Sequence, residues 1–289
     1  MEERAYGKIN LTLDILRRRE DGFHDLRMVM QSVDLFDEIT LNKREGEGIE
    51  LSCDVGYVPS DGSNIAARAA EAFFRELGIR GEGLSIAIRK TIPVSAGMAG
   101  GSSDGAAVLR ALGRMYRPDL PAERLEAIAA QVGSDVPYCV RGGTALAEGR
   151  GEILTDLPPL PPCWFVLCKP GFPISTPELF SRVRVKQLQF HPDTAGMLHS
   201  LETGDLEGIC RRIYNVFEEL LPRKYSRVLE LKAALLDQGA LAAAMTGTGP
   251  TVFGVFASEE AARRAADVIG RVCGRVYVAR PVKKYESLV

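Results

Sequence analysis

Hydrophobic and polar residues alternate with a period of two in several short stretches of the chain. Between positions 8 and 14, the polar side chains of Lys8, Asn10 and Thr12 fall on one face of a predicted strand and apolar side chains on the other. Further strands are predicted at 26–33, 38–42, 49–53, 84–90, 164–168, 240–245, 252–256 and 276–279. The polar face of the first strand is either solvated, the commoner outcome, or forms the wall of a ligand site.

Helical signals separate these strands. Residues 63–78 are rich in alanine, Ser63 or Asn64 can cap the helix, and Gly78 ends it. Thr176 is expected at the N-cap of another helix, with proline at its first position. The remaining helices are predicted from the glycine-rich loop to about 116, at 121–131, over several segments up to 236 with a break at Pro222, and at 259–270.

Prolines mark one boundary within the chain of 289 residues. Residues 155–162 contain four of the 16 prolines, which is typical of a stiff, non-helical connection. We therefore predict two domains, at 1–157 and 163–289.

Charge and composition exclude several classes of partner. The 36 basic and 38 acidic residues give a net charge of −2, so we expect neither a nucleic acid nor a membrane surface as partner. Six scattered cysteines and three histidines indicate neither a zinc site nor a disulfide framework. The chain has no long apolar run and no apolar leader, so we expect a cytoplasmic protein that binds a small molecule.

A glycine-rich loop is the strongest chemical signal. Glycines free the backbone for positive φ and close approach, and the alanine-rich sequence that follows favours a helix. The N-terminus of such a helix, with its unpaired N–H groups, suits a phosphate chain. The loop consists of Pro93, Val94, Ser95, Ala96, Gly97, Met98, Ala99, Gly100, Gly101, Ser102 and Ser103. Ser102 and Ser103 place two hydroxyls where a phosphate oxygen or its Mg²⁺ would lie.

The two common glycine-loop motifs do not match this loop. A Walker P-loop requires a lysine before its Ser or Thr, and the dinucleotide fingerprint requires Gly-x-Gly-x-x-Gly. A flexible connection or a simple helix cap remains an alternative.

Three other positions each leave two interpretations open. Asp135 is either the cap of a short helix or a candidate base facing the loop. Phe23 and His24 follow a tight turn, where they either bind a ligand or fasten the turn to the core. The small-residue turn 246–250 is either a second contact with a ligand or a hairpin loop.

Taken together, three of these motifs resemble the GHMP kinase superfamily, named for galacto-, homoserine, mevalonate and phosphomevalonate kinases. They are Lys8-Ile-Asn-Leu, the loop 93–103 and Thr246-Gly-Thr-Gly-Pro. The resemblance implies an α+β, two-domain GHMP kinase fold, with an N-terminal mixed sheet-and-helix domain and a C-terminal ferredoxin-like α/β sandwich. Residues 21–24 and 133–137 further resemble the members that phosphorylate a cytidine diphosphate-linked polyol of the non-mevalonate isoprenoid precursor pathway.

The resemblance implies a role for each matching residue in an ATP-dependent transfer to the 2-hydroxyl of that polyol. Lys8 and Asp135 match the catalytic pair, and 93–103 matches the ATP loop. Ser102 or Ser103 could hold Mg²⁺ or the β-phosphate, and Ser102 is our candidate for the metal. Residues near the adenine are Asn64 and Lys90. Contacts with the substrate are assigned to Asn10, Phe23, His24, Thr176 and Phe180, with His24 reading the cytosine edge and the base between the rings of Phe23 and Phe180.

Departures from the commonest family pattern are small. Met98 replaces a leucine and Ala99 a glycine, and both changes are tolerable for packing. Phe23 replaces a tyrosine, which removes a possible hydrogen bond but keeps a ring for stacking. Alternatives that stay open are another GHMP kinase, acting on homoserine, a mevalonate derivative or a sugar, and a non-catalytic nucleotide-binding protein of the same fold. We expect a monomer or a homodimer.

Overall fold

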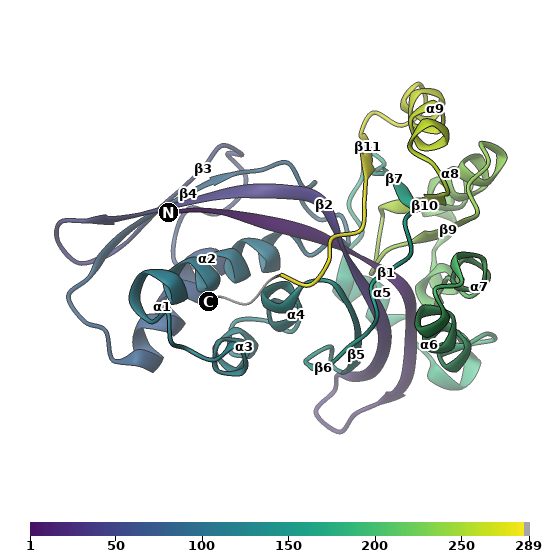
Figure 1. Ribbon diagram of the computed structural model, residues 1–289. Coiled ribbons are helices and arrows are strands. Elements are labelled where there is room, and N and C mark those ends of the chain that lie inside the picture. The colour runs from purple at the N-terminus through teal and green to yellow at the C-terminus, as the bar shows by residue number, and fades with distance from the viewer. Residues whose placement is uncertain (286–289) are drawn as a thin grey trace.

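One long hairpin forms the centre of the molecule. The computed structural model describes residues 1–285, and its first two strands are β1 (Glu2–Arg18) and β2 (His24–Arg44), paired antiparallel (Figure 1). The prediction of two separate strands within β2 is wrong. Charged residues interrupt the apolar pattern between positions 33 and 38. These residues find partners in other segments, because Asp34 accepts the N–H of Arg280 and Asp37 accepts the N–H groups of Thr91 and Ile92, so the strand continues.

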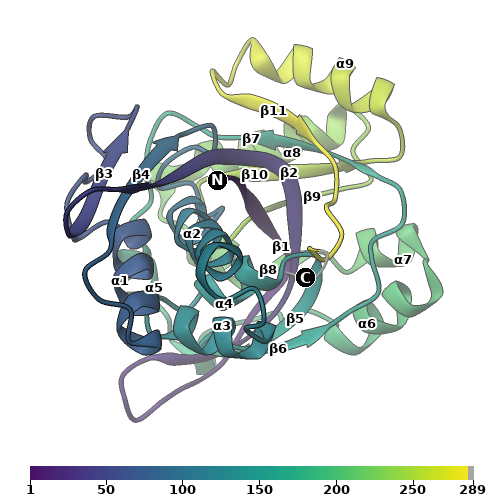
Figure 2. The ribbon, with the colours of Figure 1, turned by 60° about the vertical axis from the view of Figure 1, so that its left-hand side comes forward.

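A seven-stranded sheet is built on this hairpin, in the order β3-β4-β2-β1-β8, with β5 also paired to β2 and β6 to β5. The added strands are β3 (Gly48–Cys53), β4 (Gly83–Arg89), β5 (Thr144–Gly149), β6 (Ile153–Asp156) and β8 (Tyr214–Asn215). The helices α1 (Ile65–Leu77), α2 (Gly100–Tyr116), α3 (Ala122–Ala130) and α4 (Val136–Arg141) gather against one face of the sheet (Figures 1 and 2). Strands β5, β6 and β8 lack a clear period in the sequence and were not predicted.

Helices α1 and α2 form where the sequence predicts them. The side chain of Asn64 accepts a hydrogen bond from the N–H of Ala66, and Gly78 ends α1 in the left-handed conformation. The two helices approach closely at Gly105, where an added Cβ would lie 2.8 Å from Cγ2 of Ile65. Gly105 therefore permits the contact that holds the start of α2 against α1.

The second sheet is fully antiparallel, in the order β11-β7-β10-β9. Its strands are β7 (Trp164–Cys168), β9 (Ala242–Met245), β10 (Val252–Phe256) and β11 (Val276–Ala279). The helices of this half are α5 (Thr176–Ser181), α6 (Thr194–Thr203), α7 (Leu206–Arg211), α8 (Ser226–Asp237) and α9 (Glu259–Gly270). This is the expected ferredoxin-like sandwich. Ser175 rather than Thr176 caps α5, because its hydroxyl accepts the N–H of Glu178.

The two halves of the chain contact each other at places other than the proline-rich connection. Strand β8 comes from the second half and pairs with β1, and a bridge joins Val33 to Pro281. In Figures 1 and 2 the segment after β11 returns along β2 towards α4. The division at 157–163 stays a prediction. One core cluster contains Ile9 and Leu11 of β1 together with Phe165 and Phe253 of the second sheet.

The six cysteines are free thiols, five of them buried. Burial raises the pKa of the Cys139 thiol to about 12.

Within residues 1–285, no helix has the length and apolar character needed to span a membrane.

Candidate active site

Three segments that are remote in the sequence surround one large cavity. Strand β1 contributes Lys8, the glycine-rich loop contributes most of its residues, and the turn before β10 contributes residues 247–249. The cavity has a volume of about 1410 Å³, larger than the roughly 300–1,000 Å³ of a site for one small ligand. Of the predicted site residues, Asn64, Lys90, Asp135, Phe23, His24, Thr176 and Phe180 also line it, whereas Asn10, Met98 and Ser103 do not.

The conformation of the glycine-rich loop differs in part from the expectation. Positive φ occurs at Ser95, Gly97 and Ala99, whereas Gly100 and Gly101 already belong to helix α2. An added Cβ at Gly97 would lie 2.3 Å from the carbonyl oxygen of Thr246. Gly97 therefore serves both positive φ and a close approach between the loop and the turn 246–249.

Replacing Gly97 with alanine is expected to lower the free energy of unfolding by about 1–3 kcal/mol and to weaken the binding of a phosphate-containing ligand to the loop, because the loop must move away from Thr246. Chemical denaturation and calorimetry measure the two effects. Gly113→Ala is the control, because its added Cβ would meet only Cδ2 of Leu125 at 4.0 Å inside helix α2. Equal behaviour of the two variants would contradict the role given to Gly97.

Helix α2 begins without a side-chain cap. Ala99, at the N-cap position, has φ of 56° and no side chain that can accept a hydrogen bond from the first turn. Ser102 lines the cavity, whereas the hydroxyl of Ser103 donates to the carbonyl of Tyr6 at 2.6 Å and lies 3.4 Å from the sulfur of Cys139. The open first turn suits an anion, and Ser102 is the hydroxyl that faces it.

The ammonium of Lys8 is held in place by Asn10. Nζ of Lys8 donates to Oδ1 of Asn10 at 2.7 Å, and the same oxygen accepts the N–H of Gly247 at 2.9 Å. Burial lowers the pKa of Lys8, and the charge of Asp135 opposes this shift. Asn10 and Thr12 are fully buried, so neither face of β1 is solvated here.

Asp135 occupies the N-cap position of α4, but its side chain makes no capping hydrogen bond. The carboxylate instead lines the cavity that Lys8 lines. An added Cβ at Gly151 would lie 3.9 Å from Oδ1 of Asp135, so the turn between β5 and β6 lies beside it. Of the two interpretations that the sequence left open, the geometry favours a carboxylate that faces the cavity.

Lys90 lies between two buried carboxylates that the sequence analysis did not single out. Its Nζ is 2.5 Å from Oδ2 of Asp37 and 2.7 Å from Oδ2 of Asp104. Burial alone would lower the pKa of Lys90, but Asp104 and Asp37 outweigh it and raise the pKa. Burial also raises the pKa of Asp104 well above its ordinary value, although Lys90 opposes this.

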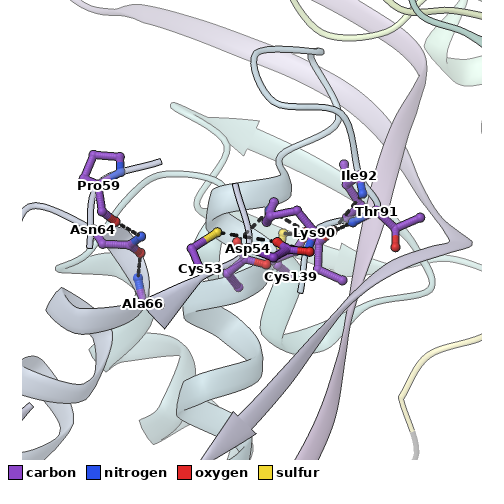
Figure 3. Close-up of polar contacts among 12 residues, drawn as sticks. Cys53, Asp54, Pro59, Asn64, Ala66, Lys90, Thr91, Ile92 and Cys139 are labelled. Atoms are coloured by element: carbon purple, nitrogen blue, oxygen red, sulfur yellow. Dashed lines mark hydrogen bonds and ion pairs between the residues drawn. The ribbon is translucent and has the colours of Figure 1, made fainter. Parts of the chain in front are cut away.

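Figure 3 places Lys90 beside Thr91, Ile92 and Asp54. The side chain of Asp54 accepts the backbone N–H of Lys90 at 3.0 Å. In the same view, the side-chain amide of Asn64 spans from the carbonyl of Pro59 to the N–H of Ala66. Both predicted adenine-side residues therefore also have structural partners.

At another part of the wall, the ring of His24 lies beside the ring of Phe180. The ring centroids of His24 and Phe180 are 5.5 Å apart, and the edge of Phe180 meets Phe217. Phe23 is 53% exposed, and the guanidinium of Arg150 lies 4.4 Å from its ring centroid. Thr176 and Thr248 share a hydrogen bond of 2.7 Å, which ties α5 to the turn before β10.

Comparison with known proteins identifies the class. Residues 64–143 match the GHMP kinases N terminal domain, and residues 197–274 match the GHMP kinases C terminal domain. The homoserine kinase from Cytophaga hutchinsonii has the same fold, with a TM-score of 0.75, 19% identity and coverage of 99% of this chain and 96% of that chain. The chain is a small-molecule kinase of the GHMP type, and membership of this class implies the use of ATP.

Closer relatives narrow the assignment. The 4-diphosphocytidyl-2-C-methyl-D-erythritol kinase of Geobacillus thermodenitrificans is 42% identical over 99% of this chain and 98% of its own length. The enzyme of the same name from Clostridium botulinum (strain Kyoto / Type A2) is 39% identical over 98% of this chain and its full length. A crystal structure of 4-(cytidine 5'-diphospho)-2C-methyl-D-erythritol kinase has a TM-score of 0.83 and 32% identity, covering 97% of this chain and 99% of that chain. The chain belongs to the family of 4-diphosphocytidyl-2-C-methyl-D-erythritol kinases.

Proposed function

We propose that this protein transfers the γ-phosphoryl group of ATP to the 2-hydroxyl of 4-diphosphocytidyl-2-C-methyl-D-erythritol. The observation that carries the proposal is the meeting of Lys8, Asp135 and the uncapped start of α2 at one cavity with room for two substrates. Phosphoryl transfer depends mainly on in-line positioning and on charge placed along the path of the transferred group.

Asp135 accepts the proton of the attacking hydroxyl in this proposal. Lys8 orients the carboxylate and stabilises negative charge on the nucleophile, and Asn10 holds the ammonium in place. Since the phosphoryl transition state is loose, orientation of the base matters more than its strength. Asn10 thus acts through Lys8 rather than on the substrate, because its side chain lies behind the cavity wall.

ATP and Mg²⁺ fit the residues at the start of α2. The open N–H groups of the first turn suit the phosphates, and Ser102 offers its hydroxyl to the metal. Residues 1–285 contain no cluster of three or more His, Cys, Asp or Glu suited to a metal ion, in keeping with Mg²⁺ held largely by the nucleotide. When bound, Mg²⁺ neutralises charge that develops on the phosphates.

His24 and Phe180 form the proposed cytosine site. A neutral imidazole has one donor and one acceptor, which match the donor and acceptor on a cytosine edge. The ring of Phe180, beside His24, offers a face for stacking. Phe23 is the second proposed ring, on the neighbouring hairpin turn.

The KM for the cytidyl acceptor is expected to rise as the pH falls through the lowered pKa of His24, which lies below the ordinary value of 6.5. Burial, together with the charge of Arg18, lowers the pKa of His24 from its ordinary value of 6.5, so the ring is neutral at pH 7. Protonation in the acid range converts the acceptor nitrogen into a donor and removes half of the pairing. His24→Gln keeps a donor and an acceptor but does not titrate, so its KM is expected to stay level over this range. Parallel profiles for both enzymes would contradict the assignment of His24.

ADP release in the presence of a panel of alcohols tests the function. The cytidyl acceptor is expected to give turnover well above that with homoserine or mevalonate. Turnover on one of these other alcohols alone would replace the proposed acceptor. ATP binding without turnover on any of them would indicate a nucleotide-binding protein without catalysis.

A further inference from the structure

An arginine between the proposed cytosine site and Asp135 has no role in the account so far. Arg150 lies in the turn between β5 and β6, lines the cavity, and is half-buried. Its guanidinium lies over the ring of Phe23 at 4.4 Å, and its Nη2 is 3.4 Å from the hydroxyl of Ser134. Arg150 thus reaches from the residue before Asp135 to the residue before His24.

This position matches the order of groups in the proposed acceptor. The acceptor carries a cytosine at one end, the reacting hydroxyl at the other and a diphosphate between them. His24, Phe180 and Asp135 all line the cavity, and Arg150 contacts the residues that precede His24 and Asp135 in the chain. The group that Arg150 would meet between these ends is the diphosphate, and a guanidinium fork suits phosphate oxygens.

Within residues 1–285 the guanidinium of Arg150 donates one hydrogen bond, from Nη2 to the hydroxyl of Ser134, and its other donors stay free for such a ligand. Stacking on Phe23 uses the face of the guanidinium and leaves the N–H groups in its plane available. Within residues 1–285 no carboxylate forms an ion pair with Arg150, and Asp21, whose pKa Arg150 helps to lower, is paired with Arg19. Of the residues that the structure describes, the carboxylates that line the cavity are those of Asp135 and Asp104, and Asp104 is paired with Lys90.

Glycines shape the turn that carries Arg150. Gly149 and Gly151 have φ of 69° and 111°, so the turn folds tightly on both sides of the arginine. A Cβ added at Gly151 would lie 3.9 Å from Oδ1 of Asp135. The turn that carries Arg150 therefore lies beside the proposed base.

We propose that Arg150, held on the ring of Phe23, binds the diphosphate of the acceptor and thereby selects an alcohol linked to a nucleoside diphosphate over one that is not. The inference rests on the proposed function and adds a specificity-determining residue to it. Stacking on Phe23 keeps Arg150 in place before the acceptor binds.

Binding of CDP and of cytidine, measured by calorimetry, tests the role without turnover. The wild-type protein is expected to bind CDP more tightly than cytidine, and Arg150→Gln is expected to weaken CDP binding about 10- to 100-fold while cytidine binding changes little. Arg150→Lys keeps the charge but loses the fork and the stacking, so its affinity for CDP is expected to fall between the two. Arg80→Gln removes an exposed arginine outside the cavity and is the matched control.

Kinetics give the second readout. Arg150→Gln is expected to raise the KM for the acceptor by the same factor, with the KM for ATP unchanged and kcat within a few-fold of wild type. An unchanged preference for CDP over cytidine in Arg150→Gln, in an enzyme that phosphorylates the acceptor, would overturn the inference and leave the proposed function intact. A loss confined to kcat or to the KM for ATP would also overturn it, because the arginine would then act on the transferred group. If the wild-type protein phosphorylates no cytidyl acceptor, the proposed function itself fails.

Discussion

Replacing Asp135 with asparagine is expected to lower kcat by about 10²- to 10⁴-fold, the usual contribution of a general base. The carboxylate lines the cavity together with Lys8 and caps no helix, so an amide of the same shape removes the proton acceptor and leaves the fold unchanged. Single-turnover phosphoryl transfer, measured by rapid quench with ATP and acceptor both saturating, reports the chemical step. The KM for ATP is expected to stay within a few-fold of wild type.

The control for this variant is Asp119→Asn. Asp119 lies outside the cavity and, within residues 1–285, pairs with Arg117 alone on the surface, so the same change in charge there should leave transfer unaffected. If Asp135→Asn transferred phosphate at a near-normal rate while remaining folded, the chemistry would have to be assigned to another group.

The second large effect concerns stability. Replacing Lys90 with methionine is expected to lower the free energy of unfolding by about 3–5 kcal/mol, because Asp37 and Asp104 then share a buried site without their cation. The chain is also expected to bind ATP less well, since Asp37 holds the backbone N–H groups of Thr91 and Ile92 at the entrance to the glycine-rich loop. Urea denaturation monitored by circular dichroism measures the first effect.

Two further variants make the stability result specific. Lys224→Met breaks an exposed ion pair with Glu178 and is expected to cost at most about 1 kcal/mol. Lys90→Met combined with Asp104→Asn removes one of the two stranded carboxylates and is expected to recover part of the loss. A cost for Lys90→Met no greater than that of Lys224→Met would show that the buried cluster contributes little to folding.

Local sequence signals predicted much of the fold. Helix α1 has its cap at Asn64 and its stop at Gly78, and strands β7, β10 and β11 have the predicted bounds because short apolar runs end at clear breaks. Strand β8 has two residues and depends on pairing with β1, far away in the chain, so no local period marks it. The predicted interruption of β2 is wrong because contacts with distant segments decided the structure there too. The charged residues Asp34 and Asp37 bond to Arg280 and Lys90.

The candidate site was predictable where the chemistry lies in motifs. Lys8, Asp135 and the loop residues were named from the sequence, and the fold brings Lys8, Asp135 and most of the loop to one cavity. The internal supports were not predictable from spacing alone. Asp37 falls in the gap between the predicted strands 26–33 and 38–42, and Asp104 looks like an ordinary helix residue in the sequence. Arg150 lies in a turn, and its contact with Phe23 is visible only in the structure.

The second half of the chain contributes a strand to the first sheet, so the enzyme cannot be cut into two independent fragments at the proline-rich connection. A fragment that stopped at the proline-rich connection would lack β8, which completes one side of β1, and Thr246 and Gly247, which bond to Asn10 behind Lys8. The first half would then contain the glycine-rich loop and Lys8, but not the residues that hold Asn10 beside Lys8. Assembly of a competent phosphotransferase therefore waits until nearly the whole polypeptide has been synthesised.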